Sequence, residues 1–508
     1  MSEGDISKTP RRSSLDISAD AIHQIASQMT KLVSDYFTGI PDLPVFPQNY
    51  GGRTIEELDA ELSQEGVPLE KLVAECRTIM NLSRHNGHPR FFGYVASPST
   101  PIGAYADLVA SALNANLTCW RSGPAGTEVE RTLVRWLGSM IGFHENAHGL
   151  LTSGGSMANL IALLIASRTK SGTDISSKGL WNSGSPLTTY ASEEIHMSVA
   201  KAVDILGFGR EQMRIIECDN RMRMNVEILR QRIQIDLSEG LRPFCVVGSA
   251  GTVNTGAVDP LNDIADVAAE FNLWFHVDGA YGAPGSLDPR KKALFAGLER
   301  ADSVSLDPHK WLYVPVDAGC LLLRDQAGAR TTFNAADADY IKVHGHSDEE
   351  AFAFWDYGIE LSRRFRALKI WLTLRYYGVR RIAEAIAEDN SLAEYLASIV
   401  SKAEDFELLA PVQLSICCFR YLPGAFRLRL QTAISETEVA VINEELDRLN
   451  EQLMSAVQTS GRAYLSNATV HGRFALRACI TNFRTTRADI DETIEIIREA
   501  AVKMSDMR

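Results

Sequence analysis

The sequence lacks a long apolar run, an excess of basic residues and any pair of cysteines spaced for a zinc or redox site. Its longest apolar run, around residues 158–166, is interrupted by Asn159 and is shorter than the ~20 residues of a membrane-spanning helix. Lys and Arg number 51 against 64 Asp and Glu, and the formal charge of −13 disfavours nucleic acid and anionic membranes as partners. None of the eight cysteines forms a C-x-x-C motif, and we predict no metal site.

The beginning of the sequence also lacks an apolar signal-peptide core, and acidic residues stand at positions 3 and 5. We therefore expect a cytoplasmic protein whose cysteines are mostly reduced. The composition, 45% hydrophobic and 23% charged, is typical of globular proteins and excludes a disordered or disulfide-stapled chain. At about 150 residues per domain, the length of 508 residues suggests about three domains.

The pattern along the chain predicts four regions. Residues 1–20 are polar and are expected to form a flexible tail. Within an N-terminal helical segment over 21–101, apolar residues recurring at three and four predict amphipathic helices over 22–37 and 55–80. A large α/β domain is expected over 102–395, and a small α+β domain over 396–508. For this C-terminal part we predict helices over 352–403, 436–457 and 488–503 and strands over 414–421 and 426–431.

Short β-rich runs alternate with helical patterns between residues 149 and 325. Strands are predicted over 149–152, 187–191, 213–218, 243–248, 273–277, 303–306 and 319–323, and helices over 157–167, 198–206, 226–237 and 261–271. This alternation is typical of an α/β fold with a mainly parallel sheet flanked by helices. Ligands of such folds bind at the carboxyl ends of the strands, so residues that follow the strands are the candidates for chemistry.

Two of these strand ends carry charged residues. Lys310 follows the predicted strand over 303–306, in the segment Asp307-Pro-His-Lys-Trp. A lysine beside an aromatic ring at a strand end can be partly desolvated, which lowers its pKa and frees the amine to attack a carbonyl. Lys310 is thus a Schiff-base candidate, although most lysines simply lie on the surface. Asp278 ends the preceding strand, where a carboxylate can hold a protonated ring nitrogen of an electron-sink cofactor or merely cap a turn.

Two further strand ends carry groups that suit a phosphorylated ring. The run Ser-Gly-Gly-Ser over 153–156 leads from a strand into an apolar helix, whose first backbone N–H groups can bind a phosphate. Such a turn is also common without any ligand. His196 lies just beyond the strand over 187–191, where an imidazole can stack on a flat ring, handle protons or play a structural part only.

These four signals, in this order and spacing, resemble the pyridoxal-phosphate-dependent decarboxylases that include the aromatic amino acid and glutamate decarboxylases. The resemblance extends from about residue 88 to residue 491 and includes His88-Pro-Arg-Phe-Phe-Gly-Tyr, Trp136-Leu-Gly and Arg363-Arg-Phe-Arg-Ala-Leu-Lys-Ile-Trp. It implies a fold type I pyridoxal-phosphate-dependent transferase-like architecture. It further implies a carboxy-lyase that uses pyridoxal 5'-phosphate to convert an L-amino acid into the amine and carbon dioxide.

The resemblance also assigns residues to the cofactor. It implies that Lys310 bonds to the cofactor aldehyde, that Asp278 pairs with the ring nitrogen and that His196 stacks on the ring. The other residues assigned to the cofactor are Ala280 under the ring, Gly155 and Ser156 at the phosphate, and Thr252, His309 and Asp307 around it.

The chain departs from the family pattern near two of these positions. Val253 could take the place of Thr252 as the residue that touches the cofactor. Asp307 stands where relatives often have Asn or Ser, so an anionic side chain replaces a neutral one near the phosphate.

Relatives carry a mobile loop with a tyrosine that protonates the substrate carbon after carbon dioxide leaves. The matching segment over 338–342 assigns this role to Tyr340, which could equally be an ordinary exposed tyrosine. In relatives that oxidise their substrate to an aldehyde, this tyrosine is typically Phe or the stacking histidine is replaced. Tyr340 together with His196 therefore favours amine formation, with oxidative decarboxylation to an aldehyde as an alternative. His344 and His346 on the same loop lack a third ligand and are taken as polar loop residues.

Two other classes of protein remain open. An aminotransferase would use the same Lys310 and Asp278 but orient the Cα–H bond for cleavage. A scaffold without turnover would need neither residue. For the substrate, Ser97 and Arg121 are the candidate binding residues, since an arginine can pair with an acidic side chain although a surface role is common. Aromatic L-amino acids are favoured over acidic ones by a small margin.

The resemblance implies a homodimer with active sites at the subunit interface. The predicted helices over 21–101 have no sheet of their own to cover. They would therefore act as a clasp that embraces the partner subunit.

Overall fold

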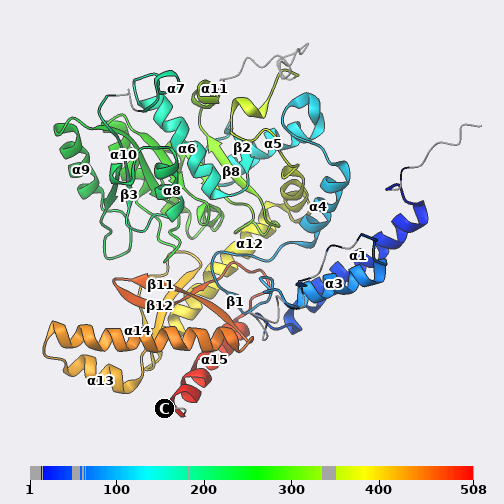
Figure 1. Cartoon of the computed structure of the whole chain (residues 1–508). Coiled ribbons are helices and arrows are strands. Elements are labelled where there is room, and N and C mark those ends of the chain that lie inside the picture. Colours follow the sequence, from blue (N-terminus) through cyan, green and yellow to red (C-terminus); the bar gives the residue numbers. More distant parts are fainter. Residues whose placement is uncertain are drawn as a thin grey trace, which may run out of the picture. The chain divides into compact units, whose positions relative to one another are not determined.

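The computed structural model describes residues 13, 15–47, 56, 58–59, 62, 64–180, 184–333 and 350–506. The chain divides into two compact units, Met1–His85 and Asn86–Arg508 (Figure 1). Among the described residues, no helix has the length and apolar character needed to cross a membrane.

In the described part of the first unit, α1 (Ala19–Gly39) and α3 (Leu69–Asn81) are in contact. α1 begins at Ser18, whose hydroxyl accepts a hydrogen bond of 3.2 Å from the backbone N–H of Ala21. The helix predicted over 22–37 is confirmed. The helix predicted over 55–80 is interrupted: Glu56 and Leu58 are helical, residues 64–68 are not, and α3 begins only after Pro68, since a proline disfavours helical conformation in the residue before it.

A seven-stranded sheet forms the centre of the second unit, in the order β2-β8-β7-β6-β5-β3-β4 (Figure 1). Its strands are β2 (His148–Thr152), β3 (Leu187–Ser192), β4 (Met213–Ile216), β5 (Arg242–Ser249), β6 (Trp274–Asp278), β7 (Ser303–Leu306) and β8 (Gly319–Leu323). β8 runs antiparallel to β2 and β7, and the other neighbours pair in parallel. The prediction of a mainly parallel sheet is confirmed.

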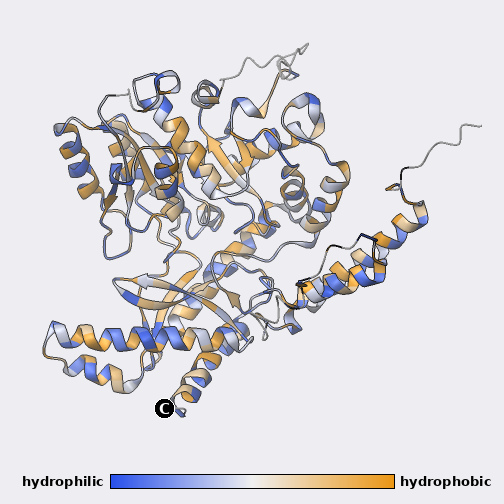
Figure 2. Ribbon diagram, in the orientation of Figure 1, coloured by the Kyte–Doolittle hydropathy of each residue, from blue (hydrophilic) through white to orange (hydrophobic). Residues whose placement is uncertain are grey.

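Helices cover both faces of this sheet. One face packs against α6 (Gly155–Lys170) and α8 (Met197–Ile205). The other packs against α5 (Pro124–Met140), α9 (Val226–Ser238), α10 (Leu261–Glu270) and the first part of α12 (Ala367–Lys402). Successive side chains alternate between the faces, so Leu150 packs with α6 and α8 while Leu151 packs on the other side. Strand β8 is accordingly apolar along its length (Figure 2), and β6 and β7 are buried at every residue, as is typical of sheets covered on both faces.

The C-terminal part of the second unit has its own sheet, in the order β1-β11-β12-β10-β9. Its strands are β1 (Phe91–Phe92), β9 (Phe406–Leu408), β10 (Ile416–Tyr421), β11 (Tyr464–Val470) and β12 (Arg473–Cys479). β1 comes from far earlier in the chain and pairs in parallel with β11. The helices α14 (Glu436–Thr459) and α15 (Arg487–Asp506) pack on this sheet. The remaining helices are α4 (Pro101–Leu113), α7 (Ile175–Lys178), α11 (Ala327–Phe333) and α13 (Gly424–Thr432).

Two predictions for the C-terminal part are wrong. The strand predicted over 426–431 lies in α13, where Phe426 and Leu430, four residues apart, pack beside α14. The long helix predicted from residue 352 begins only at Ala367, and it kinks at Gly378, whose φ of 74° is in the left-handed region that glycine adopts without strain. Strands β11 and β12 were not predicted.

Candidate active site

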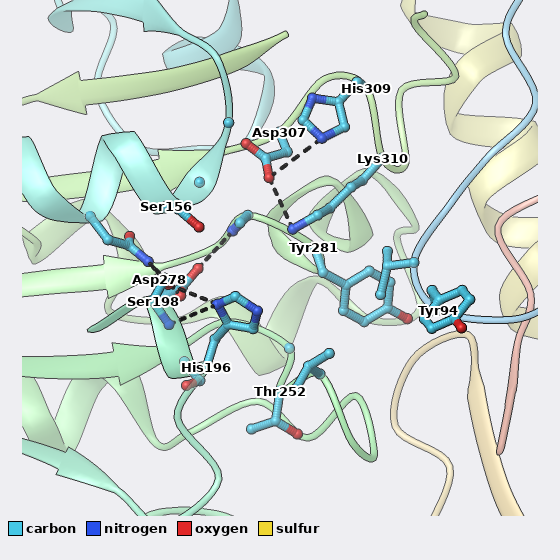
Figure 3. A pocket seen from close by; sticks show the side chains of 18 of the residues that line it. Tyr94, Ser156, His196, Ser198, Thr252, Asp278, Tyr281, Asp307, His309 and Lys310 are labelled. Atoms are coloured by element: carbon cyan, nitrogen blue, oxygen red, sulfur yellow. Dashed lines mark hydrogen bonds and ion pairs between the residues drawn. The ribbon is translucent and has the colours of Figure 1, made fainter. Parts of the chain in front are cut away.

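One cavity of about 540 Å³ lies at the carboxyl ends of the parallel strands. Side chains that follow β2, β3, β5, β6 and β7 line it on one side, and residues of β11 and β12 line it on the other. Figure 3 shows Ser156, His196, Asp278 and Lys310 converging on this space from different elements. The residues assigned to the cofactor by resemblance therefore meet in one place.

Lys310 lies in the turn after β7, where its Nζ is 2.9 Å from Oδ2 of Asp307. Burial alone would lower the pKa of Lys310, but the carboxylates of Asp307 and Asp278 outweigh it and raise the pKa above its usual value. The expected lowering of the pKa of Lys310 is thus wrong, because the carboxylate three residues away outweighs the effect of desolvation. Lys310 is held as an ammonium paired with Asp307.

Asp278 is the last residue of β6 and is 8% exposed. Its Oδ2 accepts a hydrogen bond of 2.9 Å from Asn159, and its Oδ1 accepts one of 3.1 Å from the backbone N–H of Ala280. Burial alone would raise the pKa of Asp278, but Lys310, His276 and the hydrogen bond from Asn159 together lower it. The site thus contains a buried, ionised carboxylate.

His196 is the N-cap residue of α8 and lines the cavity. Its Nδ1 accepts a hydrogen bond of 3.2 Å from the backbone N–H of Ser198 and lies 2.7 Å from the hydroxyl of the same residue. Burial lowers the pKa of His196 despite the nearby carboxylate of Asp278. The imidazole is therefore neutral near pH 7, with Nδ1 as an acceptor.

Gly155, at the start of α6, is packed too closely to its neighbours for a side chain. A Cβ placed on Gly155 would lie 2.8 Å from Cβ of Ala280 and 3.1 Å from Oδ2 of Asp307. The backbone at the start of α6 can therefore approach a ligand closely. The first N–H groups of a helix have no intrahelical acceptor, so this end of α6 suits an anion, and Ser156 adds a hydroxyl at the cavity wall.

Asp307 lies beside this helix start and is 2% exposed. Its Oδ1 is buried and has no hydrogen-bond partner within the described part of the chain. Thr252 and Val253 both line the cavity, so the choice between them stays open. His309 also lines it, and its Nδ1 lies 2.8 Å from the backbone oxygen and 3.0 Å from the backbone nitrogen of Ala318.

Two of the described site candidates, Ser97 and Arg121, are not part of this cavity lining. The hydroxyl of Ser97 donates to the backbone carbonyls of His309 and Lys310 and so holds the lysine-bearing turn. Arg121 is half exposed and pairs with Glu350 at 3.7 Å. Tyr340 lies outside the described residues. The roles of these residues stay predictions.

Arg477 lines the cavity and was missed by the sequence analysis. It lies on β12, is 3% exposed, and donates from Nε to the carbonyl of Asn254 at 3.1 Å and from Nη1 to the carbonyl of Tyr94 at 2.8 Å. Its Nη2 is buried with no hydrogen-bond partner among the described residues. No local motif marks this arginine, since Tyr94, Asn254 and Arg477 meet only in the folded chain.

The residues present fit pyridoxal phosphate. Lys310 supplies an amine for an aldehyde, Asp278 supplies an anion for a protonated ring nitrogen, and the start of α6 supplies N–H groups for a phosphate. Gly155, where a Cβ would lie 2.8 Å from Cβ of Ala280, leaves the backbone open to such a group.

Known proteins match both the sequence and the structure. The family model for the pyridoxal-dependent decarboxylase conserved domain matches residues 52–422. An aromatic-L-amino-acid decarboxylase of Bacillus atrophaeus is 36% identical over 97% of this chain and 98% of its own. A phenylacetaldehyde synthase of a Rosa hybrid cultivar is 29% identical over 92% of this chain and 91% of its own.

Two crystal structures share the fold over nearly the whole length. Mouse CSAD has a TM-score of 0.89 at 27% sequence identity, and the match covers 96% of this chain and 99% of the mouse chain. Oryza sativa TDC with PLP and tryptamine has a TM-score of 0.87 at 28% sequence identity, and the match covers 97% of this chain and 100% of the rice chain. The architecture is that of fold type I, and the chain belongs to the pyridoxal-dependent decarboxylase family as a pyridoxal-phosphate-dependent carboxy-lyase.

Proposed function

We propose that the protein decarboxylates an aromatic L-amino acid and releases the amine and carbon dioxide. The observation that carries this proposal is the meeting of Lys310, Asp278, His196 and the unpartnered Nη2 of Arg477 at one cavity. Relatives of similar length include both amine-forming decarboxylases and aldehyde synthases, so the choice between the products depends on individual residues.

The cofactor and the chain divide the work. Bound pyridoxal phosphate supplies an aldehyde that bonds to amino groups and a ring that accepts the electron pair left by departing carbon dioxide. Asp278 keeps a proton on the ring nitrogen, because an ionised carboxylate in a buried position stabilises a positive charge beside it. Lys310 holds the cofactor between turnovers, and the start of α6 with Gly155 and Ser156 holds its phosphate.

Arg477 binds the α-carboxylate of the substrate in this proposal. A buried guanidinium with an unused N–H group strongly favours an anionic partner, because an unsatisfied charged donor is costly in a buried site. The α-carboxylate is the anion that every amino acid substrate brings. Holding it fixes which bond at the α-carbon stands ready to break, which favours decarboxylation over the aminotransferase alternative.

The proton that replaces carbon dioxide comes from Tyr340 in this proposal, and the support for this role is in the sequence alone. A phenol at this position with His196 at the cavity wall supports amine formation, since the resemblance associates loss of either with aldehyde formation. The substrate side chain would lie against Tyr94, Val95 and Val316, which are among the apolar residues of the lining. Such a surface suits an aromatic ring better than a carboxylate.

The experiment is to supply the pyridoxal-phosphate-loaded protein with single aromatic and acidic L-amino acids and no keto acid. Amine and carbon dioxide in equal amounts, without hydrogen peroxide, are expected. Aldehyde with hydrogen peroxide would replace the proposal by oxidative decarboxylation. Product formation only with added keto acid would replace it by transamination. The matched variant Tyr340→Phe is expected to shift products from amine to aldehyde.

We also propose that the protein works as a homodimer. The support is in the first unit, where α1 and α3 leave Ile22 54% and Ile79 48% exposed within their own unit. Apolar side chains on a helix pair need a cover, and a second copy of the chain would supply it. Light scattering is expected to give twice the chain mass, and a folded, active monomer would contradict the proposal.

A further inference from the structure

A buried asparagine connects the two cofactor-facing side chains, Asp278 and His196. Asn159 lies in the second turn of α6 and is 1% exposed. Its Nδ2 is 2.9 Å from Oδ2 of Asp278 and 3.0 Å from Oγ of Ser198. Ser198 in turn lies 2.7 Å from Nδ1 of His196. Asn159 itself takes no part in the bond changes of the proposed reaction.

The direction of each hydrogen bond follows from the chemistry of the groups. The ionised carboxylate of Asp278 can only accept, so the NH₂ group of Asn159 must face it. The amide oxygen of Asn159 then faces Nε2 of His276 at 2.9 Å, and that nitrogen must donate. Burial lowers the pKa of His276 to about 4, so its ring is neutral and carries its single proton on Nε2. The amide orientation is thus fixed from both sides.

The hydrogen-bond directions also determine which nitrogen of His196 carries the proton. The NH₂ group of Asn159 has two hydrogens, of which one goes to Asp278 and the other to the hydroxyl of Ser198. Because the hydroxyl of Ser198 accepts a hydrogen bond from Asn159, its own hydrogen is free to be donated to Nδ1 of His196. The backbone N–H of Ser198 donates to the same nitrogen. The neutral imidazole therefore carries its proton on Nε2. That nitrogen makes no hydrogen bond to any described residue, while the ring lines the cavity.

We propose that Asn159 is a positioning residue that holds Asp278 and His196 in register from α6 and keeps His196 as an N–H donor toward the cavity. The inference rests on the proposed function, in which Asp278 serves the ring nitrogen and His196 faces the substrate. One amide group orients both, so the ring-pairing carboxylate and the imidazole cannot shift independently. Residues on α6, β6 and α8 are thereby tied together around the cavity.

Two variants separate the two arms of this arrangement. Asn159→Leu removes the hydrogen bonds that Asn159 donates to Asp278 and Ser198. Ser198→Ala removes the hydroxyl that links Asn159 to His196 but keeps the hydrogen bond from Asn159 to Asp278. We expect pyridoxal phosphate to bind Asn159→Leu about 10- to 100-fold more weakly, since a hydrogen bond to a charged group contributes about 1.5–3 kcal/mol. Binding to Ser198→Ala should stay within about 2-fold of wild type. The measurement is a titration of the cofactor-free full-length protein followed by absorbance.

The imidazole arm has its own readout. Hydrogen bonds donated to Nδ1 favour the neutral ring, so weakening them should raise the pKa of His196 toward its usual value in both variants. Nuclear magnetic resonance of ¹⁵N-histidine-labelled protein reports both this pKa and which ring nitrogen carries the proton. The signal of His196 is identified by its loss in His196→Gln. The charged groups around His196 are Asp278, Lys310, Asp307 and Lys201, and the two test variants keep all of them.

Asn450→Leu is the matched control, because Asn450 is equally buried in α14 and lies outside the cavity lining. It should change stability without changing cofactor affinity or the His196 signal. If Asn159→Leu fails to fold, Asn159→Asp keeps the shape while replacing the donors with an oxygen and should weaken cofactor binding at least as much. A proton on Nδ1 in the wild type, or unchanged cofactor affinity in these Asn159 variants, would overturn the inference. Neither the cofactor affinity nor the His196 signal depends on amine release, so the inference about Asn159 can fail while the proposed function holds, and the reverse.

Discussion

The cavity has two walls that differ in how the sequence builds them. The cofactor wall comes from turns that follow β2, β3, β5, β6 and β7, each directly after a strand. The substrate wall comes from residues 94–95, from the loop around Val316 and from β11 and β12, which are far apart in the chain. The first wall is set by local sequence and sheet order, whereas the second exists only after the small sheet has packed beside the large one.

The two walls also differ in the groups that they present to the cavity. The cofactor wall holds the ionisable groups that any reaction of the family needs, Lys310 and Asp278 among them. The substrate wall holds one buried cation, Arg477, among apolar and neutral side chains. Changes in the first wall should therefore affect every substrate through the cofactor, and changes in the second should leave the cofactor in place and alter the use of substrate.

The largest effect is expected for Asp278→Asn, in the cofactor wall. The variant keeps the shape but removes the buried negative charge, and loss of one partner of a buried pair costs about 3–5 kcal/mol. At about 1.4 kcal/mol per tenfold, kcat should fall by about 10²- to 10⁴-fold for all substrates alike. The absorbance of the bound cofactor should change as well, since the ring nitrogen loses its anion.

Asp236→Asn is the control for this variant. Asp236 is also a fully buried carboxylate, but it pairs with Arg214 on another side of the sheet and does not line the cavity. It should lower stability and leave the cofactor spectrum unchanged. A kcat for Asp278→Asn within tenfold of wild type would show that the cofactor wall does not depend on this charge.

The second effect is expected for Arg477→Met, in the substrate wall. Charge-assisted hydrogen bonds contribute about 1.5–3 kcal/mol, so kcat/KM should fall by about 10- to 100-fold. Cofactor affinity should stay within about 2-fold, because Arg477 faces the substrate side in this proposal. Steady-state kinetics on aromatic and acidic amino acids should show the same relative loss for each, as expected if the arginine holds the α-carboxylate.

A selective loss for acidic substrates would instead assign Arg477 to the side chain. Arg420→Met is the matched control, because Arg420 is buried on β10 and pairs with Glu407 outside the cavity. It is expected to reduce stability while kcat/KM of the folded fraction stays unchanged. Equal kinetic losses in both variants would mean that the effect of Arg477→Met is structural.

The same contrast explains what could be predicted from the sequence. β7 and β8 were predicted to the residue, and Asp278 and Lys310 were identified, because apolar runs ending in a charged or glycine-rich turn are local signals. Arg477 could not be found this way, since its partners are the backbone carbonyls of Tyr94 and Asn254. An arginine in a short strand carries no mark of burial until the tertiary contacts exist.

Failures within the cofactor wall have a different cause. The raised pKa of Lys310 was missed although Asp307 stands three residues before it, because the net shift depends on the distance of 2.9 Å between the two side chains.

Outside the cavity, the strand predicted over 426–431 alternates apolar and polar residues. α13 forms there instead, because Phe426 and Leu430 also match helical spacing and pack beside α14. Short apolar segments are decided by the partner they meet.

A moderate effect is expected for Asp307→Asn, which tests the departure of the cofactor wall from its relatives. The buried Oδ1 has no donor within the described part of the chain and would face a phosphate as a like charge. An amide can donate instead, so pyridoxal phosphate should bind about 2- to 10-fold more tightly, as for one net hydrogen bond. Titration with pyridoxal, which lacks the phosphate, supplies the comparison.

The ratio of the two affinities removes a second effect of the same variant. Asp307 raises the pKa of Lys310, so its loss should lower that pKa and let the amine react at lower pH with either aldehyde. That change affects pyridoxal and pyridoxal phosphate equally and cancels in the ratio. A ratio equal to that of the wild type would mean that Asp307 does not act on the phosphate.

The smallest effect is expected for Arg121→Ala, which tests whether the substrate wall extends beyond the cavity lining. Arg121 is half exposed and 3.7 Å from Glu350, and exposed pairs of this kind contribute at most about 1 kcal/mol. At about 1.4 kcal/mol per tenfold, the preference between aromatic and acidic substrates should therefore change by less than about 5-fold. Arg477→Met should instead lower kcat/KM for both classes alike. The relevant measurement is the ratio of kcat/KM for the two substrate classes in both variants. A tenfold change of this ratio in Arg121→Ala alone would assign the selection between the two substrate classes to this exposed arginine.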